Sequence, residues 1–338
     1  MDGVMMVRVA INGFGRIGRL ALRCGIDSKK IEWVAINGVK DAKAAEVLFR
    51  YDSVHGKFDG AVEGKGNELV VNGKRIKLLN QRDDPSKLPW KEMKIDVVLE
   101  CTGDMTKKEE AAAHLKAGAR KVIISAPAKG DESITSIVLG VNDKALDKNE
   151  EIVDNASCTT NCLMPVLRVL HESFGLKRVF MTTIHGYTND QRVLDGSHKD
   201  LRRARAAALN IIPTSTGASK AAAKVMPELK GKVEGMAIRV PVPDGSLVDV
   251  VAELGKNVTK EEVNKAMKEA SLGYLKGILE YTEDPIVSSD VIGNRHSSIF
   301  DGLSTMVLGG NLVKVLSWYD NEMGYSQRLV EVCEKIGK

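Results

Sequence analysis

The chain has 338 residues, 43% of them hydrophobic and 28% charged, and its formal net charge is +4. This length predicts about two domains, and this composition predicts a globular chain that can bury a core. The small net charge disfavours a nucleic-acid partner and suits anionic small molecules, and no run approaches the ~20 apolar residues of a membrane helix.

The five cysteines are an odd number, and residues 1–6 lack the long apolar stretch of a signal peptide. Both features are typical of a protein from a reducing compartment, so we expect a cytoplasmic location and no secretory leader.

The N-terminal residues predict a dinucleotide-binding fold. A β-branched run at 7–12 leads into Gly13-Phe14-Gly15-Arg16-Ile17-Gly18, and residues 19–23 have helical character. A G-x-G-x-x-G motif between a strand and a helix allows a tight turn, so that a pyrophosphate can sit on the helix N-terminus. A tight turn without a ligand is the alternative.

The second predicted strand, 31–37, ends without the acidic residue that usually binds the ribose of NAD. Gly38 stands there, and Lys40 follows. Because an acid would repel a 2′-phosphate, its absence favours NADP or dual use. Two alternatives stay open: Asp41 turns inward to the ribose, or Lys40 is a solvated surface residue.

Helices and strands then alternate along the first half of the chain. We expect a helix at 42–50, a hairpin of 68–71 with 75–79, a strand at 96–100, a helix at 109–117 and a strand at 121–125. This order predicts a parallel sheet that binds ligands at the carboxyl ends of its strands. Thr102, Gly103 and Ser125 fall at such ends.

A candidate nucleophile lies between a strand at 151–153 and an apolar helical pattern at 163–170. Cys158 is at or near a helix N-terminus, where the helix dipole and free N–H groups are expected to make a thiol more acidic and more nucleophilic. An inert core cysteine is the alternative. No second Cys/His pair has zinc-like spacing, so we expect no metal site, and we interpret Cys162 as structural.

The second half supplies a candidate base and candidate anion-binding groups. A strand at 178–184 ends at His185, which could converge with Cys158; a surface or core histidine is the alternative. Arginines at 202, 203 and 205 and hydroxyls at 214–216 fit an oxyanion. A solvated basic loop or a subunit contact is the alternative for some of these arginines. A strand at 235–241 carries Arg239, which we expect to be buried and to need an anionic partner.

The remaining elements of the second half are two long strands, 246–254 and 312–319, expected to be antiparallel, an amphipathic helix at 260–272 and a last helix that ends near 336.

The motifs at 12–18, 157–162 and 318–322, with His185 and Arg239, make the chain resemble the phosphorylating glyceraldehyde-3-phosphate dehydrogenase family. The resemblance covers essentially the whole chain. It implies an α/β protein with a Rossmann-type dinucleotide-binding domain (1–157 and 322–338) and an α+β catalytic domain (158–321) with a mostly antiparallel sheet. It further implies a cytoplasmic homotetramer in which the segment 195–205 lies near the cofactor of a neighbouring subunit.

The resemblance also implies the roles of the site residues. Cys158 would attack the aldehyde of a triose phosphate, and His185 would act as the base; after hydride transfer, inorganic phosphate would release the acyl group. The residues expected to bind the cofactor are Gly13, Gly15, Arg16, Ile17, Gly18, Gly38, Lys40, Arg82, Thr102, Ser125, Ser197 and Asn321. Those expected to bind substrate or phosphate are Ser157, Thr159, Thr188, Arg203, Thr216, Gly217 and Arg239.

Two departures from the family pattern concern the cofactor. NAD-specific members usually carry an acid where Gly38 stands, and many carry Leu-Pro where this chain has Gly196-Ser197. Both departures favour NADP, or dual use that leans to NADP. Two other functions stay open: an erythrose-4-phosphate dehydrogenase, and a non-enzymatic RNA-binding protein that uses Arg202 to Arg205. The low aromatic content of 4% disfavours the second.

Overall fold

The computed structural model describes residues 6–130, 134–147 and 149–337. Residues 1–5, on which the expectation of a missing leader partly rests, lie outside this range. The chain forms two compact units: unit 1 holds residues 1–137, 143–156 and 326–338, and unit 2 holds 138–142 and 157–325. Each unit is described by itself.

Unit 1 is built on one sheet. Its strands are β1 (Val7–Asn12), β2 (Ile31–Asn37), β3 (Val62–Lys65), β4 (Glu68–Val71), β5 (Lys74–Leu79), β6 (Val97–Glu100), β7 (Lys121–Ile124), β8 (Thr135–Ser136) and β9 (Ile152–Asp154). Its helices are α1 (Arg16–Gly25), α2 (Ala42–Arg50), α3 (Lys108–Lys116) and the part of α7 (Met323–Ile336) from Ser326 on.

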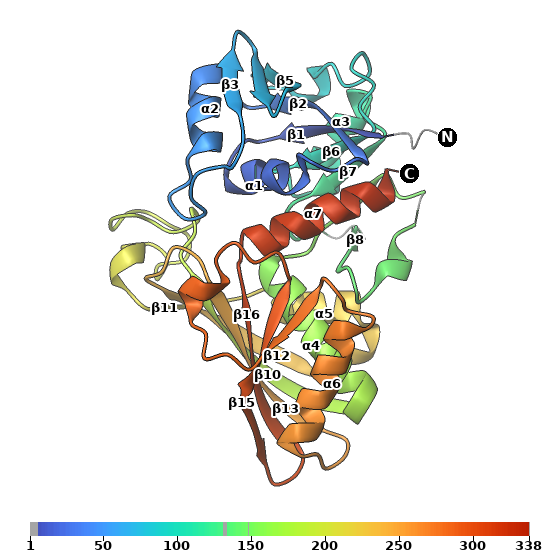
Figure 1. Cartoon of the computed structure of the whole chain (residues 1–338), viewed down its shortest axis with the longest axis vertical. Helices are drawn as coiled ribbons and strands as arrows, with labels where there is room; N and C mark the ends of the chain where they lie inside the picture. The colour runs from blue at the N-terminus through green and yellow to red at the C-terminus, as the bar shows by residue number, and fades with distance from the viewer. Residues whose placement is uncertain (1–5, 131–133, 148, 338) are drawn as a thin grey trace. The chain divides into compact units, whose positions relative to one another are not determined.

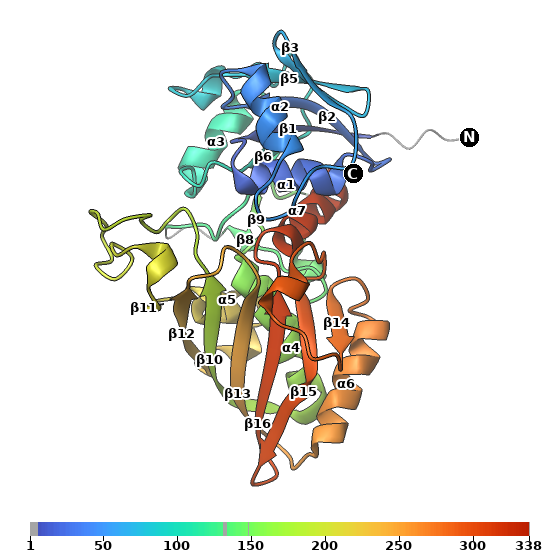
Figure 2. The same ribbon diagram turned by 60° about the vertical axis from the view of Figure 1, so that its left-hand side comes forward.

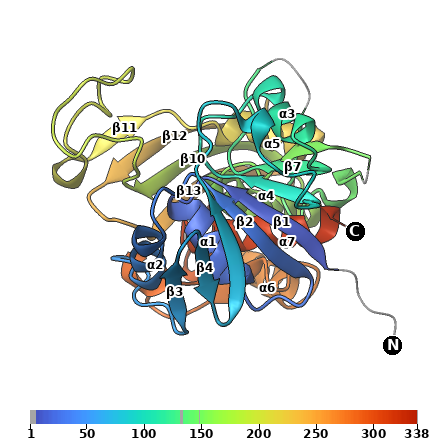
Figure 3. The same ribbon diagram turned by 90° about the horizontal axis from the view of Figure 1, so that it is seen from above.

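The strand order is β3-β4-β5-β2-β1-β6-β7-β9-β8. From β5 to β8 the neighbouring strands are parallel, and the predicted hairpin of β4 and β5, extended by β3, is antiparallel. Figures 1 and 3 show β1 and β2 side by side and α2 beside β3. This is the expected Rossmann-type arrangement, and it places the carboxyl ends of β1, β2 and β6 at one edge.

Unit 2 is built on a second sheet. Its strands are β10 (Leu176–Gly186), β11 (Ile212–Thr214), β12 (Val233–Val240), β13 (Ser246–Leu254), β14 (Leu279–Thr282), β15 (Ser298–Leu308) and β16 (Leu312–Tyr319). Its helices are α4 (Cys158–Phe174), α5 (Ala218–Val225) and α6 (Lys260–Leu272).

The order of the second sheet is β11-β12-β10-β13-β16-β15-β14, and four of its six neighbouring pairs are antiparallel within the described residues. The predicted antiparallel pair of long strands is confirmed as β13 and β16. Helices α4, α5 and α6 pack on this sheet, and Figure 2 shows β10, β13, β16 and β15 side by side in front of α4. The parallel strands β10 and β12 carry, near their carboxyl ends, His185 and Arg239, around which the site of unit 2 forms.

Several elements differ from the prediction. Helix α4 begins at Cys158, so the prediction of this residue at or near a helix N-terminus is confirmed. The helix starts five residues before the apolar pattern because Ser157 caps it and the polar first turn packs inward. Strands β3, β11, β14 and β15 and helix α5 were not predicted, since their hydrophobic patterns are short or interrupted. Helix α6 has the predicted bounds.

No helix within the described ranges is both long enough and apolar enough to cross a membrane.

Candidate active site

The glycine-rich turn of unit 1 uses each of its three glycines differently. Gly13 has a φ of +97°, and a Cβ there would lie 2.7 Å from the backbone of Cys101. A Cβ on Gly18 would lie 2.2 Å from the carbonyl oxygen of Gly13. Around Gly15, by contrast, a Cβ would meet nothing within 4 Å. The turn is therefore closely packed on two sides and open at Gly15, as a bound pyrophosphate requires.

Helix α1 starts at this opening. Gly15 is its N-cap residue and provides no side-chain cap, so the first N–H groups of the helix can receive an anion. The side chain of Arg16 is directed to Asp52 Oδ2 at 2.5 Å and to His55 Nδ1 at 3.2 Å. Burial tends to raise the pKa of Asp52, but hydrogen bonds from His55, Arg16 and Val54 hold that pKa well below its usual value. Ile17 is half-buried.

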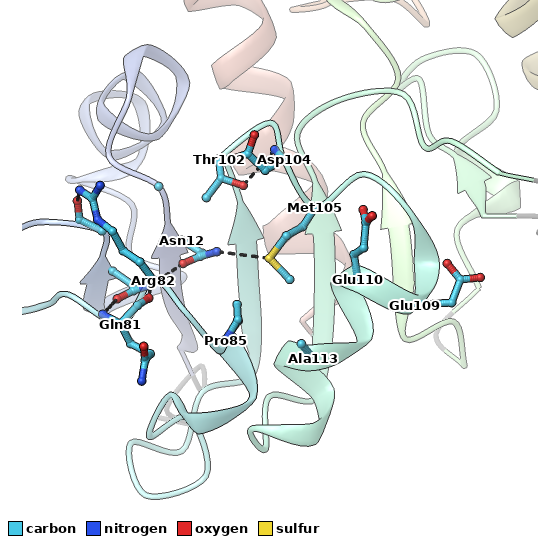
Figure 4. A pocket seen from close by; sticks show the side chains of 13 residues that line it. Asn12, Gln81, Arg82, Pro85, Thr102, Asp104, Met105, Glu109, Glu110 and Ala113 are labelled. Carbon is cyan, nitrogen blue, oxygen red and sulfur yellow. Dashed lines mark hydrogen bonds between the residues drawn. The ribbon is translucent and has the colours of Figure 1, made fainter.

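A cavity of about 570 Å³ lies at the carboxyl edge of the sheet in unit 1 (Figure 4). The residues that line it are Asn12, Gly13, Asn37, Gly38, Gln81, Arg82, Pro85, Thr102, Asp104, Met105, Glu109, Glu110 and Ala113. Four predicted cofactor residues are among them: Gly13, Gly38, Arg82 and Thr102.

Other predicted cofactor residues of unit 1 are placed differently. Lys40 is exposed and does not line the cavity. Ser125 also stands outside the lining, and its hydroxyl contacts the thiol of Cys101, whose pKa is raised by burial to about 12. Gly15, Arg16, Ile17 and Gly18 belong to the turn and to α1 rather than to the cavity wall.

The wall at Gly38 carries the positive charge of Arg82. Gly38 directly follows β2 with a φ of +95°, and Arg82 Nη2 donates to its carbonyl oxygen at 3.1 Å. Figure 4 shows Arg82 on one wall of the cavity, with Glu109 and Glu110 on the other. An arginine beside Gly38 could accommodate a 2′-phosphate.

The structure brings the predicted nucleophile and base together in unit 2. Ser157 accepts a hydrogen bond from the N–H of Thr160 at 3.1 Å and so starts α4 at Cys158. The sulfur of Cys158 lies 3.4 Å from Nε2 of His185, within hydrogen-bonding distance for sulfur. His185 is 4% exposed near the end of β10, and Nδ1 lies 2.7 Å from the carbonyl oxygen of Gly186. The pair can therefore pass a proton directly.

The environment favours the neutral form of both groups. Burial, followed by the positive charge of Arg239, lowers the pKa of His185 to about 3. Burial raises the pKa of the Cys158 thiol, against the charge of Arg239 and hydrogen bonds to Thr159. The prediction of a more acidic thiol is thus wrong in direction, because desolvation of the sulfur outweighs the charge that stabilises its anion.

An anion-binding group adjoins this pair. Arg239 Nη1 lies 3.0 Å from the carbonyl oxygen of Gly186 and 3.5 Å from the hydroxyl of Thr188. Arg239 lies in β12 and is half-buried. It is less buried than predicted from its apolar neighbours in the sequence. Its Nε is buried and has no hydrogen-bond partner among the described residues. An unsatisfied buried guanidinium donor beside a hydroxyl suits a phosphate oxygen.

The remaining predicted phosphate residues are dispersed within unit 2. The Ser157 hydroxyl lies 2.7 Å from that of Thr160. Thr216 accepts a hydrogen bond from the N–H of Ala218 at 3.2 Å, and Gly217 is the N-cap residue of α5 with open space around it.

Arg203 is held inside its own loop. Its guanidinium contacts Asp190, the Thr214 hydroxyl at 3.0 Å and the Ser215 carbonyl oxygen at 3.2 Å. These contacts tie the segment after β10 to the segment around β11. In this geometry Arg203 stabilises its own loop. The contact of Arg203 with an anion stays a prediction.

Sequence reasoning missed Tyr319, the last residue of β16. Its side chain is 1% exposed, and its hydroxyl lies 3.0 Å from that of Thr159 and 2.8 Å from that of Thr183. Thr159 follows Cys158, and Thr183 lies two residues before His185, so Tyr319 links the helix of the thiol to the strand of the imidazole. The signal was available, since a buried tyrosine hydroxyl needs polar partners.

Three further residues singled out in the sequence lie in unit 2. Asn321 is 5% exposed, and its Oδ1 accepts a hydrogen bond from the Ser246 hydroxyl. Ser197 is exposed, and its carbonyl oxygen accepts from Arg192 at 2.8 Å. Cys162 is buried and unbridged, with its sulfur 3.6 Å from the Ser298 hydroxyl.

Comparisons with known proteins agree along the chain. Residues 7–108 match the family model described as glyceraldehyde 3-phosphate dehydrogenase, NAD binding domain, and residues 157–321 match that of the C-terminal domain. The glyceraldehyde-3-phosphate dehydrogenase 1 of Bacillus subtilis is 58% identical over 335 residues, 99% of each chain. The glyceraldehyde-3-phosphate dehydrogenase of Geobacillus stearothermophilus is 59% identical over 333 residues, 98% of each chain. That of Priestia megaterium is 58% identical over 333 residues, also 98% of each chain.

Proposed function

Because the chain belongs to the glyceraldehyde-3-phosphate dehydrogenase family, we propose that it oxidises glyceraldehyde 3-phosphate and captures inorganic phosphate to form 1,3-bisphosphoglycerate, reversibly. The observation that carries this proposal is the 3.4 Å approach of Cys158 Sγ to His185 Nε2, with Arg239 and Thr188 beside the pair. Unit 1 would bind the dinucleotide and unit 2 would carry the chemistry.

The residues of unit 2 would act in the following order. The Cys158 sulfur attacks the aldehyde carbon while His185 Nε2 takes the thiol proton. Because the pKa of the ring is low, the ring accepts this proton only if the sulfur bonds to the aldehyde carbon at the same time. Arg239 and Thr188 hold the phosphate of the substrate and fix the distance of its aldehyde from the sulfur. A bound nicotinamide would supply the hydride acceptor. Loss of hydride from the thiohemiacetal oxyanion would leave the thioester, while His185 keeps the thiol proton until the sulfur leaves.

Phosphorolysis would then release the product. A phosphate oxygen attacks the thioester carbon, the C–S bond breaks, and the sulfur leaves with the electron pair and regains its proton. The thioester preserves the free energy of oxidation until phosphate arrives. Ser157, Thr159, Thr216 and Gly217 are proposed to receive that second phosphate.

We infer NAD(P) as the cofactor, with a preference for NADP. The NAD-binding family model supports binding of a nicotinamide dinucleotide. The preference rests on Gly38, where no carboxylate would repel a 2′-phosphate, and on Arg82, whose guanidinium lies 3.1 Å from the Gly38 carbonyl oxygen. Ser197 is proposed to favour the same cofactor.

Steady-state kinetics with both cofactors and both candidate aldehydes test these proposals. We expect turnover of glyceraldehyde 3-phosphate that depends on phosphate, and a higher kcat/KM with NADP than with NAD. Faster turnover of erythrose 4-phosphate without phosphate dependence would overturn the assigned substrate. A strong NAD preference would overturn only the cofactor preference.

A cytoplasmic homotetramer is proposed as the working form. The five cysteines form no disulfide among the described residues, as is usual in a reducing compartment. Unit 2 exposes large apolar side chains on β10 and on the segment 193–211, among them Phe180 at 70% and Val193 at 86%. Such patches on one chain suit subunit contacts. Light scattering of the purified protein tests the tetramer; a monomer at micromolar concentration would contradict it.

A further inference from the structure

A line of hydrogen bonds begins at two fully buried side chains of unit 1. Trp90 Nε1, which can only donate, lies 3.1 Å from His114 Nδ1. The ring of His114 therefore accepts at Nδ1 and carries its proton on Nε2, which lies 3.0 Å from Glu100 Oε2. Trp90 and His114 are 0% exposed and Glu100 is 2% exposed.

The line continues from Glu100 to the edge of the cavity. Asn12 Nδ2 donates to Glu100 Oε2 at 2.6 Å, and Asn12 Oδ1 accepts from Asn37 Nδ2 at 2.7 Å. The other carboxyl oxygen of Glu100 accepts from the N–H of Thr102 at 2.8 Å. Each of these hydrogen bonds can have only one donor and one acceptor. The orientations of the side-chain amides of Asn12 and Asn37 are therefore determined.

Asn37 ends the line in a two-point clamp. Its Nδ2 donates to the carbonyl oxygen of Gln81 at 2.7 Å, and its Oδ1 accepts from the N–H of Gln81 at 2.8 Å. The side chain thus pairs with the backbone of Gln81 as a neighbouring strand would, beyond the end of β5. Gln81 precedes Arg82, whose guanidinium is held against Gly38 at the cavity wall.

We propose that Asn37 is a positioning residue that fixes Arg82 at the cavity wall and thereby sets the affinity for a dinucleotide with a 2′-phosphate. This inference rests on the proposed function of the cavity. Both polar atoms of the Asn37 amide are engaged within the protein, so Asn37 acts on the ligand through the residues it holds. A buried line of this kind restrains the segment that it reaches.

A double-mutant cycle of Asn37→Ser with Arg82→Met tests the proposal. In the otherwise unchanged chain, Asn37→Ser is expected to raise the KM for NADP about tenfold, with kcat changed less than about twofold. In the Arg82→Met background the same substitution is expected to change that KM less than about twofold. Asn72→Ala is the matched control, since Asn72 accepts a bond from Ala61 outside the cavity lining.

Equal effects of Asn37→Ser in both backgrounds, or an unchanged KM with Arg82 present, would overturn the proposal. Should Asn37→Ser fail to fold, Glu100→Gln breaks the line two residues further back, outside the cavity lining, and takes its place in the cycle. Dinucleotide binding followed by fluorescence gives the same comparison without turnover. A chain that binds NADP but does not oxidise the triose phosphate would therefore refute the proposed function alone.

Discussion

Arg239 Nη1 lies 2.9 Å from Nδ1 of His185, on the ring nitrogen that does not meet the Cys158 sulfur. A guanidinium at this distance disfavours a second positive charge on the imidazole. Together with burial, it lowers the pKa of His185 to about 3. The imidazole is thus kept uncharged, as a base must be before it takes the thiol proton, and the same arginine remains available to an anionic substrate.

Because of His185, the protein should become less stable as the pH is lowered. Its folded pKa is about 3 and its ordinary value is 6.5, so below pH 6.5 the unfolded chain binds a proton that the folded chain does not. The contribution is complete above 6.5 and is lost toward pH 3, at up to ~1.4 kcal/mol per pH unit. Urea denaturation between about pH 7 and about pH 5 should show a shallower loss for His185→Gln than for the unchanged chain. Parallel curves would contradict this coupling.

Arg239→Met should act on both the substrate and the base. Loss of a charge-assisted hydrogen bond is expected to raise the KM for the triose phosphate about 10- to 100-fold. Removal of the nearby charge is expected to raise the pKa of His185, which NMR titration of the ring measures. Arg205→Met is the control, since Arg205 is an exposed arginine of unit 2 paired with Asp195. If the pKa of His185 is the same in Arg239→Met as in the unchanged chain, burial alone causes its low value.

Cys158→Ser should abolish aldehyde oxidation, and His185→Asn should lower kcat by about 10²- to 10⁴-fold, because the thiol then loses its proton acceptor. Cys162→Ser is the matched control: it changes a thiol one helical turn further along α4, and a hydroxyl there keeps Ser298 as a partner. Stopped-flow measurement of the first turnover gives the rate of oxidation. Appreciable oxidation by Cys158→Ser would remove Cys158 from the mechanism.

Tyr319→Phe should loosen the geometry of the thiol and the imidazole without removing either group. The variant loses the hydroxyl that bridges Thr159 and Thr183, at a cost of about 1–3 kcal/mol in the free energy of unfolding. We expect kcat to fall by about three- to tenfold, with KM nearly unchanged. Tyr281→Phe removes a hydroxyl bonded to Glu283 at a partly exposed position and should leave kcat intact. Equal kcat values for the two variants would limit Tyr319 to a structural role.

Gly38→Asp should reverse the cofactor preference. A carboxylate at this position repels a 2′-phosphate, so the ratio of kcat/KM for NADP to that for NAD is expected to fall at least about tenfold. Because Gly38 has a φ of +95°, the substitution also costs about 1 kcal/mol of stability. Gly73→Asp, at a φ of +78° outside the cavity lining, imposes similar strain and should leave the ratio unchanged. An equal loss for both cofactors would count against repulsion as the cause.

Much of the fold was predictable, because its signals are contiguous in the chain. The turn between β1 and α1 needs three glycines within six residues, and hydrophobic periodicity identified α6 and the pair of β13 with β16. The short strands β11 and β14 escaped prediction, since neither has a marked hydrophobic pattern of its own and each is stabilised by its neighbours in the sheet.

The candidate site was predictable in its residue types but not in its energetics. The sequence by itself identified Cys158 at a helix start and His185 at a strand end, since each position depends on local spacing. Tertiary structure alone decided that the two groups lie 3.4 Å apart, that the environment favours the neutral form of both, that Tyr319 bridges their elements and that Asn37 clamps Gln81. These properties arise from desolvation and from contacts between residues distant in sequence, and both exist only after the chain has packed.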